Sequence, residues 1–82
     1  MKISIEISKY PLTQEYEQPI LQFIERLHQH PGLEVHTNTM STQVFGDFHQ
    51  VMEAVQNAMF QSFTQVQKSV LVMKFINADL RP

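Results

Sequence analysis

The feature that most constrains the fold is an alternation of apolar and polar residues near the N-terminus. Over residues 3–8, three isoleucines take every second position, and two serines with Glu6 take the positions between them. Side chains on a β-strand point to opposite faces with a period of two, so this pattern predicts a strand covered on one face only. Pro11 lacks a backbone N–H and restricts the residue before it, so we expect the strand to stop near Lys9. Glu6 then lies in the middle of the uncovered face.

A helix is indicated by the next apolar residues, which recur at i, i+3, i+4 and i+7 from Ile20 to Leu27. A proline at position 19 suits a first helical turn, so we expect the helix to begin near Gln18, with an earlier turn from Thr13 as the alternative. Proline and glycine at positions 31–32 should end it. The polar residues that we place on its solvent side are Gln22, Glu25, Arg26 and Gln29.

A second helix is predicted over residues 48–62. Asp47, followed three residues later by Gln50, has the pattern of a helix-capping residue and its reciprocal partner. The apolar residues from Val51 onward keep helical spacing. Residues 63–67 are then expected to form a connection.

Three further segments are typical of strands. Residues 33–39 alternate, and residues 42–46 follow a polar turn as a third predicted strand, so we expect a β-hairpin with its tip at 40–41. Residues 68–76 are apolar on both faces except for Lys74, which predicts a fourth strand. The remaining C-terminal residues form a short polar tail.

The predicted order is therefore β-α-β-β-α-β in a single domain spanning residues 1–82. Right-handed crossovers then produce an α+β, ferredoxin-like fold: a four-stranded antiparallel sheet with two helices on one face. In this arrangement the first and third strands are central, and the second and fourth are at the edges.

Composition excludes several classes of function. Six Lys and Arg residues scattered along a chain of net charge −2 disfavour nucleic-acid binding, which relies on clustered basic side chains. The chain has no cysteine, and its four histidines lack metal-ligand spacing, so we expect no metal and no other cofactor. No apolar run approaches the ~20 residues that span a bilayer, and the N-terminus lacks the apolar core of a signal peptide. We therefore expect a cytoplasmic protein that does not associate with membranes.

No group of residues forms a catalytic constellation. The chain lacks a glycine-rich phosphate loop and a nucleophile elbow. Asp47 and His49 could be read as an acid–base pair, but helix capping explains Asp47 without chemistry. We therefore expect no catalytic residues and no enzymatic activity.

The open face of the predicted sheet combines polar and apolar side chains. Glu6 and Lys74 lie on neighbouring strands there, either as a simple cross-strand ion pair or as a carboxylate held ready for a cationic ligand. Apolar side chains on a solvent-facing sheet usually mark a contact site, so a symmetric homo-oligomer is the simplest way to cover them. The residues assigned to this face are Ser4, Glu6, Ser8, His36, Asn38, Gln43, Phe45, Val70, Val72 and Lys74.

Three segments, residues 6–12, 38–47 and 70–81, together resemble the thiamine-binding YkoF-like family. The matching motifs read E-I-S-x-Y-P-L in the first segment and M-x-T-x-x-x-G-D in the second. The resemblance implies a ferredoxin-like domain that is oligomeric through its sheets. It also implies binding of thiamine or its hydroxymethylpyrimidine half, without catalysis.

The residues that could serve such a ligand follow from this resemblance. A carboxylate such as Glu6 could accept a hydrogen bond from the 4-amino group of the pyrimidine or oppose the thiazolium cation. Tyr10 or Phe45 could stack on a ring, with a cation–π attraction of ~0.5–2 kcal/mol. Further polar contacts are expected from Ser8, Asn38, Thr39 and Thr42.

The leading hypothesis is thus a non-catalytic binding protein for thiamine or a related pyrimidine, working as a homodimer or homotetramer. The alternative is an oligomerising interaction module of the same fold with no small-molecule ligand.

Overall fold

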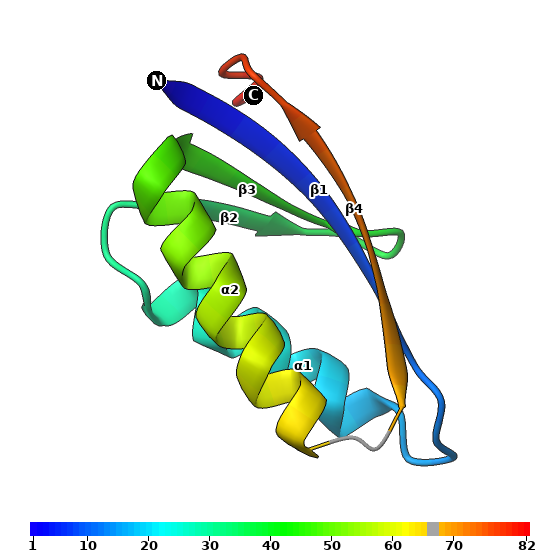
Figure 1. Cartoon of the computed structure of the whole chain (residues 1–82). Helices are drawn as coiled ribbons and strands as arrows, with labels where there is room; N and C mark the ends of the chain where they lie inside the picture. Colours follow the sequence, from blue (N-terminus) through cyan, green and yellow to red (C-terminus); the bar gives the residue numbers. More distant parts are fainter. Residues whose placement is uncertain (66–67) are drawn as a thin grey trace.

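The computed structural model describes residues 1–65 and 68–82 of the chain. A four-stranded sheet carries both helices on one face (Figure 1). The elements in chain order are β1 (Lys2–Pro11), α1 (Glu17–Gln29), β2 (Glu34–Thr37), β3 (Thr42–Asp47), α2 (Phe48–Gln65) and β4 (Ser69–Ile76). No helix among these residues is long and apolar enough to cross a membrane.

The strands are ordered β2-β3-β1-β4 and every neighbouring pair is antiparallel. β1 and β3 are therefore central, which confirms the predicted ferredoxin-like α+β fold. In the register, Glu6 lies opposite Gln43 on one side and Lys74 on the other. Residues that pair directly share a face of the sheet, so these three side chains lie on the same face.

The three isoleucines of β1 form the centre of the core beneath the helices. Ile3, Ile5 and Ile7 are buried together with Phe23 and Leu27 of α1 and with apolar residues of α2. Burying a side chain of this size stabilises the fold by about 1.5–3 kcal/mol. The predicted orientation of β1 is therefore confirmed.

β1 is longer than predicted, because it continues through Pro11, which pairs with Ser69. The register with β3 ends at Ile7, so the last residues of β1 have a neighbour on the β4 side only. The amide of Leu12 donates to the carbonyl of Lys68 at 3.0 Å, and bonding direction alternates along a strand. Pro11 therefore faces the unpaired side, where its missing N–H removes no ladder hydrogen bond.

The remaining boundaries differ by a few residues. α1 begins one residue before the expected start, and β2 ends at Thr37 because the next residue enters a turn. α2 continues to Gln65, although the sequence predicted a connection from residue 63. In its last turn the Thr64 hydroxyl donates a hydrogen bond to the carbonyl of Gln61 at 2.7 Å. The rest of that expected connection, residues 66–67, lies outside the described residues.

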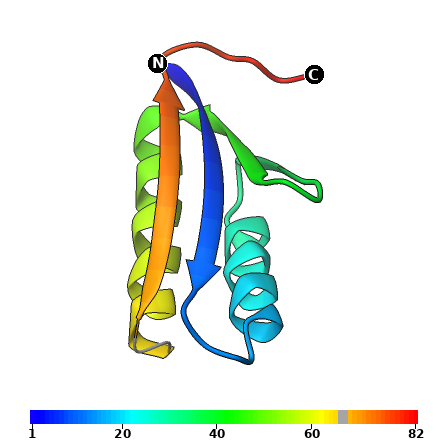
Figure 2. The same cartoon turned by 90° about the vertical axis from the view of Figure 1, so that its right-hand side faces the viewer.

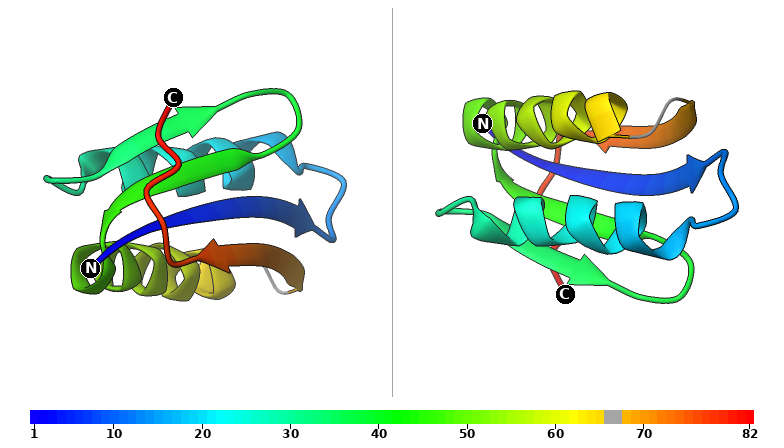
Figure 3. Two further views of the ribbon diagram at one scale, coloured as in Figure 1. Left: turned by 90° about the horizontal axis from the view of Figure 1, so that it is seen from above. Right: turned by 90° about the horizontal axis from the view of Figure 1, so that it is seen from below.

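The C-terminal tail crosses the open face of the sheet, which the sequence did not predict. It leaves the end of β4 and passes over β1 and β3 toward β2 (Figures 2 and 3). Ser4 fastens it: the hydroxyl donates to the carbonyl of Ala78 at 2.7 Å and accepts from the amide of Leu80 at 2.9 Å. At the far side, Arg81 lies 3.6 Å from Glu34 of β2. The tail therefore covers one end of the face that carries Glu6.

Candidate functional site

Glu6 lies on the face of the sheet opposite the helices, where the alternation placed it. Its side chain is 44% exposed, so the carboxylate is partly enclosed and still reachable from solvent. Lys74 of β4, 80% exposed, brings its ammonium to 3.5 Å from Glu6 Oε1. An ion pair this exposed contributes about 1 kcal/mol or less, so Lys74 is a weak and displaceable counter-ion.

The other carboxylate oxygen is held by the hairpin. The hydroxyl of Ser41 donates to Glu6 Oε2 at 2.9 Å, and the side-chain amide of Gln43 donates to Ser41 Oγ at 2.8 Å. The result is a relay in which an amide orients a hydroxyl and the hydroxyl orients the carboxylate. Hydrogen bonds to a charged acceptor are short and strong, so Glu6 has a defined position.

A hollow of about 400 Å³ lies beside Glu6 and is mainly apolar. Phe45 and Ile76 line it from the sheet, and Leu80 lines it from the tail. A volume of this size is within the range of small-molecule sites, about 300–1,000 Å³. We call it the open-face hollow; its lining residues are Ser4, Ile5, Glu6, Gln43, Phe45, Lys74, Phe75, Ile76 and Leu80.

Phe45 is not part of an exposed apolar patch, contrary to the sequence prediction. It is only 5% exposed, and Ser4 opposite it on β1 is equally buried. His36 packs edge-on against the Phe45 ring, with centroids 5.7 Å apart, and the tail crosses this end of the sheet. Phe45 can therefore contact a ligand only as a wall of the hollow.

A second and smaller hollow of about 240 Å³ gathers five of the other predicted residues. It lies between the end of β1, the turn joining β2 to β3, and α1. Ile7 is the last β1 residue paired with β3, so this part of β1 presents a free edge to the turn. We call this space the hairpin hollow; the predicted residues that line it are Ser8, Tyr10, Asn38, Thr39 and Thr42.

Two of these residues have structural tasks that limit them as ligand contacts. Asn38 Oδ1 accepts from the amides of Met40 and Ser41 at 2.8 and 3.0 Å, so it shapes the turn. Thr42 is buried, pairs with Ile7, and has its hydroxyl 3.1 Å from that of Thr37. Its side chain is therefore on the helix-covered face, opposite to Glu6.

The two hollows are linked through Ser41, which lines the hairpin hollow and binds the carboxylate beside the open-face hollow. The seven predicted residues thus divide into a pair, Glu6 and Phe45, and a group of five around the turn. Sequence reasoning missed Ser41 as a partner of Glu6. It also missed Leu80 as a wall of the open-face hollow.

Polar and charged residues flank the covered end of the face. His36 Nε2 lies 2.5 Å from Glu34, and Arg81 pairs with Asp79 at 2.8 Å. The Arg81 guanidinium holds the pKa of Asp79 below its usual value, and Asp79 in turn raises the pKa of Arg81. Within the described part of the chain, no three His, Asp or Glu side chains are grouped as a metal site.

Neither a scan of protein-family models nor a search of curated proteins finds a match to the chain. Solved structures do match. A protein from Streptococcus pneumoniae has a TM-score of 0.87 at 21% identity, covering 98% of this chain and 90% of that one. A hypothetical protein from Methanocaldococcus jannaschii has a TM-score of 0.82 at 24% identity, covering 99% and 84%.

A third similar structure comes from Thermotoga maritima and is described as a provisional thiamine biosynthesis or salvage protein. Its TM-score is 0.83 at 19% identity, covering 95% of this chain and 85% of that one. At such identities the likeness establishes the fold. It agrees with the ferredoxin-like fold that the sequence resemblance implied.

Proposed function

We propose that the protein binds a small molecule on the open face of its sheet without catalysing a reaction. We further propose that the ligand is thiamine or its hydroxymethylpyrimidine half. The observation that carries the proposal is the setting of Glu6, a carboxylate oriented by Ser41 beside an apolar hollow and paired with an exposed lysine. The motif resemblance and the Thermotoga protein support the ligand class.

The chemistry of the ligand matches this setting. Thiamine joins a permanently cationic thiazolium to an aminopyrimidine, and the carboxylate of Glu6 can accept from the amino group or oppose the cation. Phe45, Ile76 and Leu80 offer apolar surface for a ring. Lys74 occupies the position that a cationic group would take, and little free energy is lost when it moves aside.

Calorimetric titration with thiamine and with hydroxymethylpyrimidine tests the proposal. Glu6→Gln should weaken binding roughly tenfold or more, because a neutral amide cannot replace a charge-assisted bond. Lys74→Gln should strengthen thiamine binding roughly two- to fivefold, since it removes the competing cation. The control, Glu53→Gln on the exposed side of α2, should bind as the unchanged protein does.

The test is specific because the two substitutions should change the affinity for thiamine in opposite directions. A general loss of stability would weaken binding in both variants. Unchanged affinity in Glu6→Gln would show that this carboxylate is not part of the binding site. If neither compound binds at millimolar concentration, the proposal that thiamine or hydroxymethylpyrimidine is the ligand is refuted.

We also propose that copies of the chain associate through their sheets as a homodimer or homotetramer. Val70, Val72 and Ile76 lie in a row on the open face of β4 and are each about half exposed. An apolar row of this kind is typical of a contact site. It also favours the second candidate function, an interaction module that binds no small molecule.

Sedimentation velocity on a charged variant tests the association. Val72→Glu should convert the oligomer to monomer, because burying an unpaired carboxylate in an apolar interface costs several kcal/mol. Gln56→Glu, on the exposed side of α2, is the matched control and should leave the oligomer intact. If Val72→Glu sediments like the control, the open face of β4 is not the interface.

A further inference from the structure

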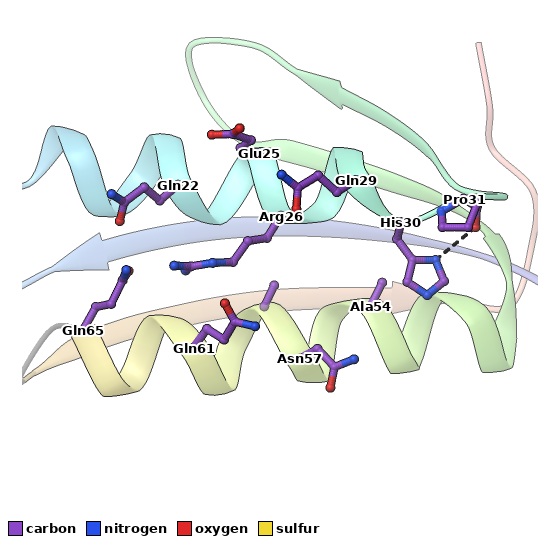
Figure 4. Close-up of a pocket in the computed structure, with 11 residues that line it drawn as sticks. Gln22, Glu25, Arg26, Gln29, His30, Pro31, Ala54, Asn57, Gln61 and Gln65 are labelled. Carbon is purple, nitrogen blue, oxygen red and sulfur yellow. Dashed lines mark hydrogen bonds between the residues drawn. The ribbon is translucent and has the colours of Figure 1, made fainter.

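A groove of about 460 Å³ runs between the two helices, on the layer of the molecule away from Glu6. Figure 4 shows Arg26 of α1 lying along this groove, with Gln61 and Gln65 of α2 on its other side. Five of the eleven residues that line the groove carry uncharged amide side chains. The volume of the groove is in the range of small-molecule sites. The lining amides are Gln22, Gln29, Asn57, Gln61 and Gln65.

Arg26 is the unusual member of this groove. The helical pattern placed it on the solvent side of α1, but it is half-buried because α2 packs alongside. Its Nη1 atom is fully buried and has no hydrogen-bond partner among the described residues. A guanidinium is always charged, and leaving a buried charged donor without an acceptor costs free energy. A ligand that carries a hydrogen-bond acceptor could therefore supply the partner that the Arg26 guanidinium lacks.

A second cation lies close to Arg26. Lys9 extends from β1 under the helices, where its ammonium bonds the hydroxyl of Ser62 and lies 5.5 Å from the centroid of Phe23. Burial, and then the positive charge of Arg26, lower the pKa of Lys9. The two cations therefore repel each other and concentrate positive potential beneath the groove.

No carboxylate neutralises these two cations within the part of the chain that the structure describes. None of the ion pairs formed there includes Lys9 or Arg26. Glu25 is the single acidic residue among the described residues that line the groove, and Figure 4 shows it pointing away from Arg26. Buried or half-buried cations are normally paired, so this arrangement is incomplete without an anion.

We propose that the groove between α1 and α2 binds the oxyanion group, phosphate or carboxylate, of a small polar molecule. Arg26 donates to the oxyanion through its guanidinium, and Lys9 adds attraction from below. The amide side chains of Gln22, Gln61 and Gln65 supply donors and acceptors for the rest of the ligand. The site is separate from the open face, so it does not depend on the function proposed for Glu6.

Titration followed by amide chemical shifts tests the site in the intact chain. Inorganic phosphate is added in one series and citrate in another, at constant ionic strength. In the unchanged protein at least one anion should produce saturable shifts in the side-chain amides of Gln22 and Gln61. The series that saturates at lower concentration distinguishes a phosphate site from a carboxylate site.

Two variants and one control assign the binding to the proposed cations. Arg26→Gln should weaken binding roughly tenfold or more, as expected when charge-assisted hydrogen bonds are lost. Lys9→Met, which keeps the apolar stem, should weaken it by a smaller factor. Arg81→Gln removes an equal charge on the opposite face of the sheet and should leave binding unchanged.

Each contrary result overturns the proposal. Linear shifts in both series would indicate only a general salt effect, and saturable shifts that map outside the groove would place the site elsewhere. Equal affinity in Arg26→Gln and Arg81→Gln would exclude Arg26 as the anion ligand. The readout in the unchanged protein decides the matter even if a variant is poorly folded.

Discussion

Replacing Ser4 with alanine should detach the C-terminal tail from the sheet. Ser4 is 5% exposed, and its hydroxyl makes two hydrogen bonds to tail backbone groups, at 2.7 and 2.9 Å. Each such bond contributes about 0.5–1.5 kcal/mol net, which puts the loss at about 1–3 kcal/mol. The tail can lift off and bond with water, so we expect the lower part of that range, about 1–2 kcal/mol. In a domain of this size each kcal/mol lowers Tm by about 4–8 °C.

Ser8→Ala is the matched control, because Ser8 lies on the same strand and the same face. Urea unfolding measures the free energy of unfolding of both variants. The difference between the two values excludes the intrinsic effect of placing alanine in β1, because both variants share it. Hydrogen exchange at the Leu80 amide, which loses its acceptor only in Ser4→Ala, gives an independent local readout. Equal stability of the two variants within about 0.3 kcal/mol, with unchanged exchange at Leu80, would refute the role of Ser4.

Two further predictions concern the core and the start of the chain. Leu27→Ala should lower the free energy of unfolding by about 2–5 kcal/mol, because Leu27 is 0% exposed. The control Leu21→Ala, at a 57% exposed position of the same helix, should change it little. Equal losses of the two variants in urea unfolding would contradict the packing of Leu27 in the core. A hydrogen bond from the N-terminal ammonium holds the pKa of Asp47 below its ordinary value of 3.8. The stability that Asp47 contributes is therefore present above pH 3.8 and is lost as the pH falls through its lower folded-state pKa. In unfolding experiments at a series of acid pH values, the difference in unfolding free energy between the unchanged protein and Asp47→Asn should therefore shrink. A difference that does not depend on pH would show that the charge of Asp47 is unimportant.

The fold could be predicted because its main signals are periodic. The alternation around Glu6 fixes which side of β1 is buried, and the helical spacing from Ile20 to Leu27 fixes the face of α1 that packs on it. The ends of the helices and strands were predicted only to within a few residues, since they depend on which elements pack or pair beside them. Pro11 can belong to β1 because, in the part of the chain that the structure describes, its other side pairs with no strand.

The site was only partly predictable for the same reason. A period of two places Glu6 on the open face, but the bond from Ser41 depends on a turn shaped by Asn38. The tail gave no sequence signal because it is held through the carbonyl of Ala78 and the amide of Leu80, backbone groups that every residue except proline possesses. Arg26 was placed in solvent because one helix considered alone does not indicate where a second helix will lie.

The strand order has a consequence for synthesis of the chain. β1 pairs along most of its length with β4, which follows the other strands of this sheet in the sequence. Until β4 emerges from the ribosome, β1 is an edge strand with one row of backbone donors and acceptors open. During that interval a β4 segment from another copy could pair with β1 in the native register. Strand exchange between nascent chains is therefore a route of misassembly that this topology leaves open.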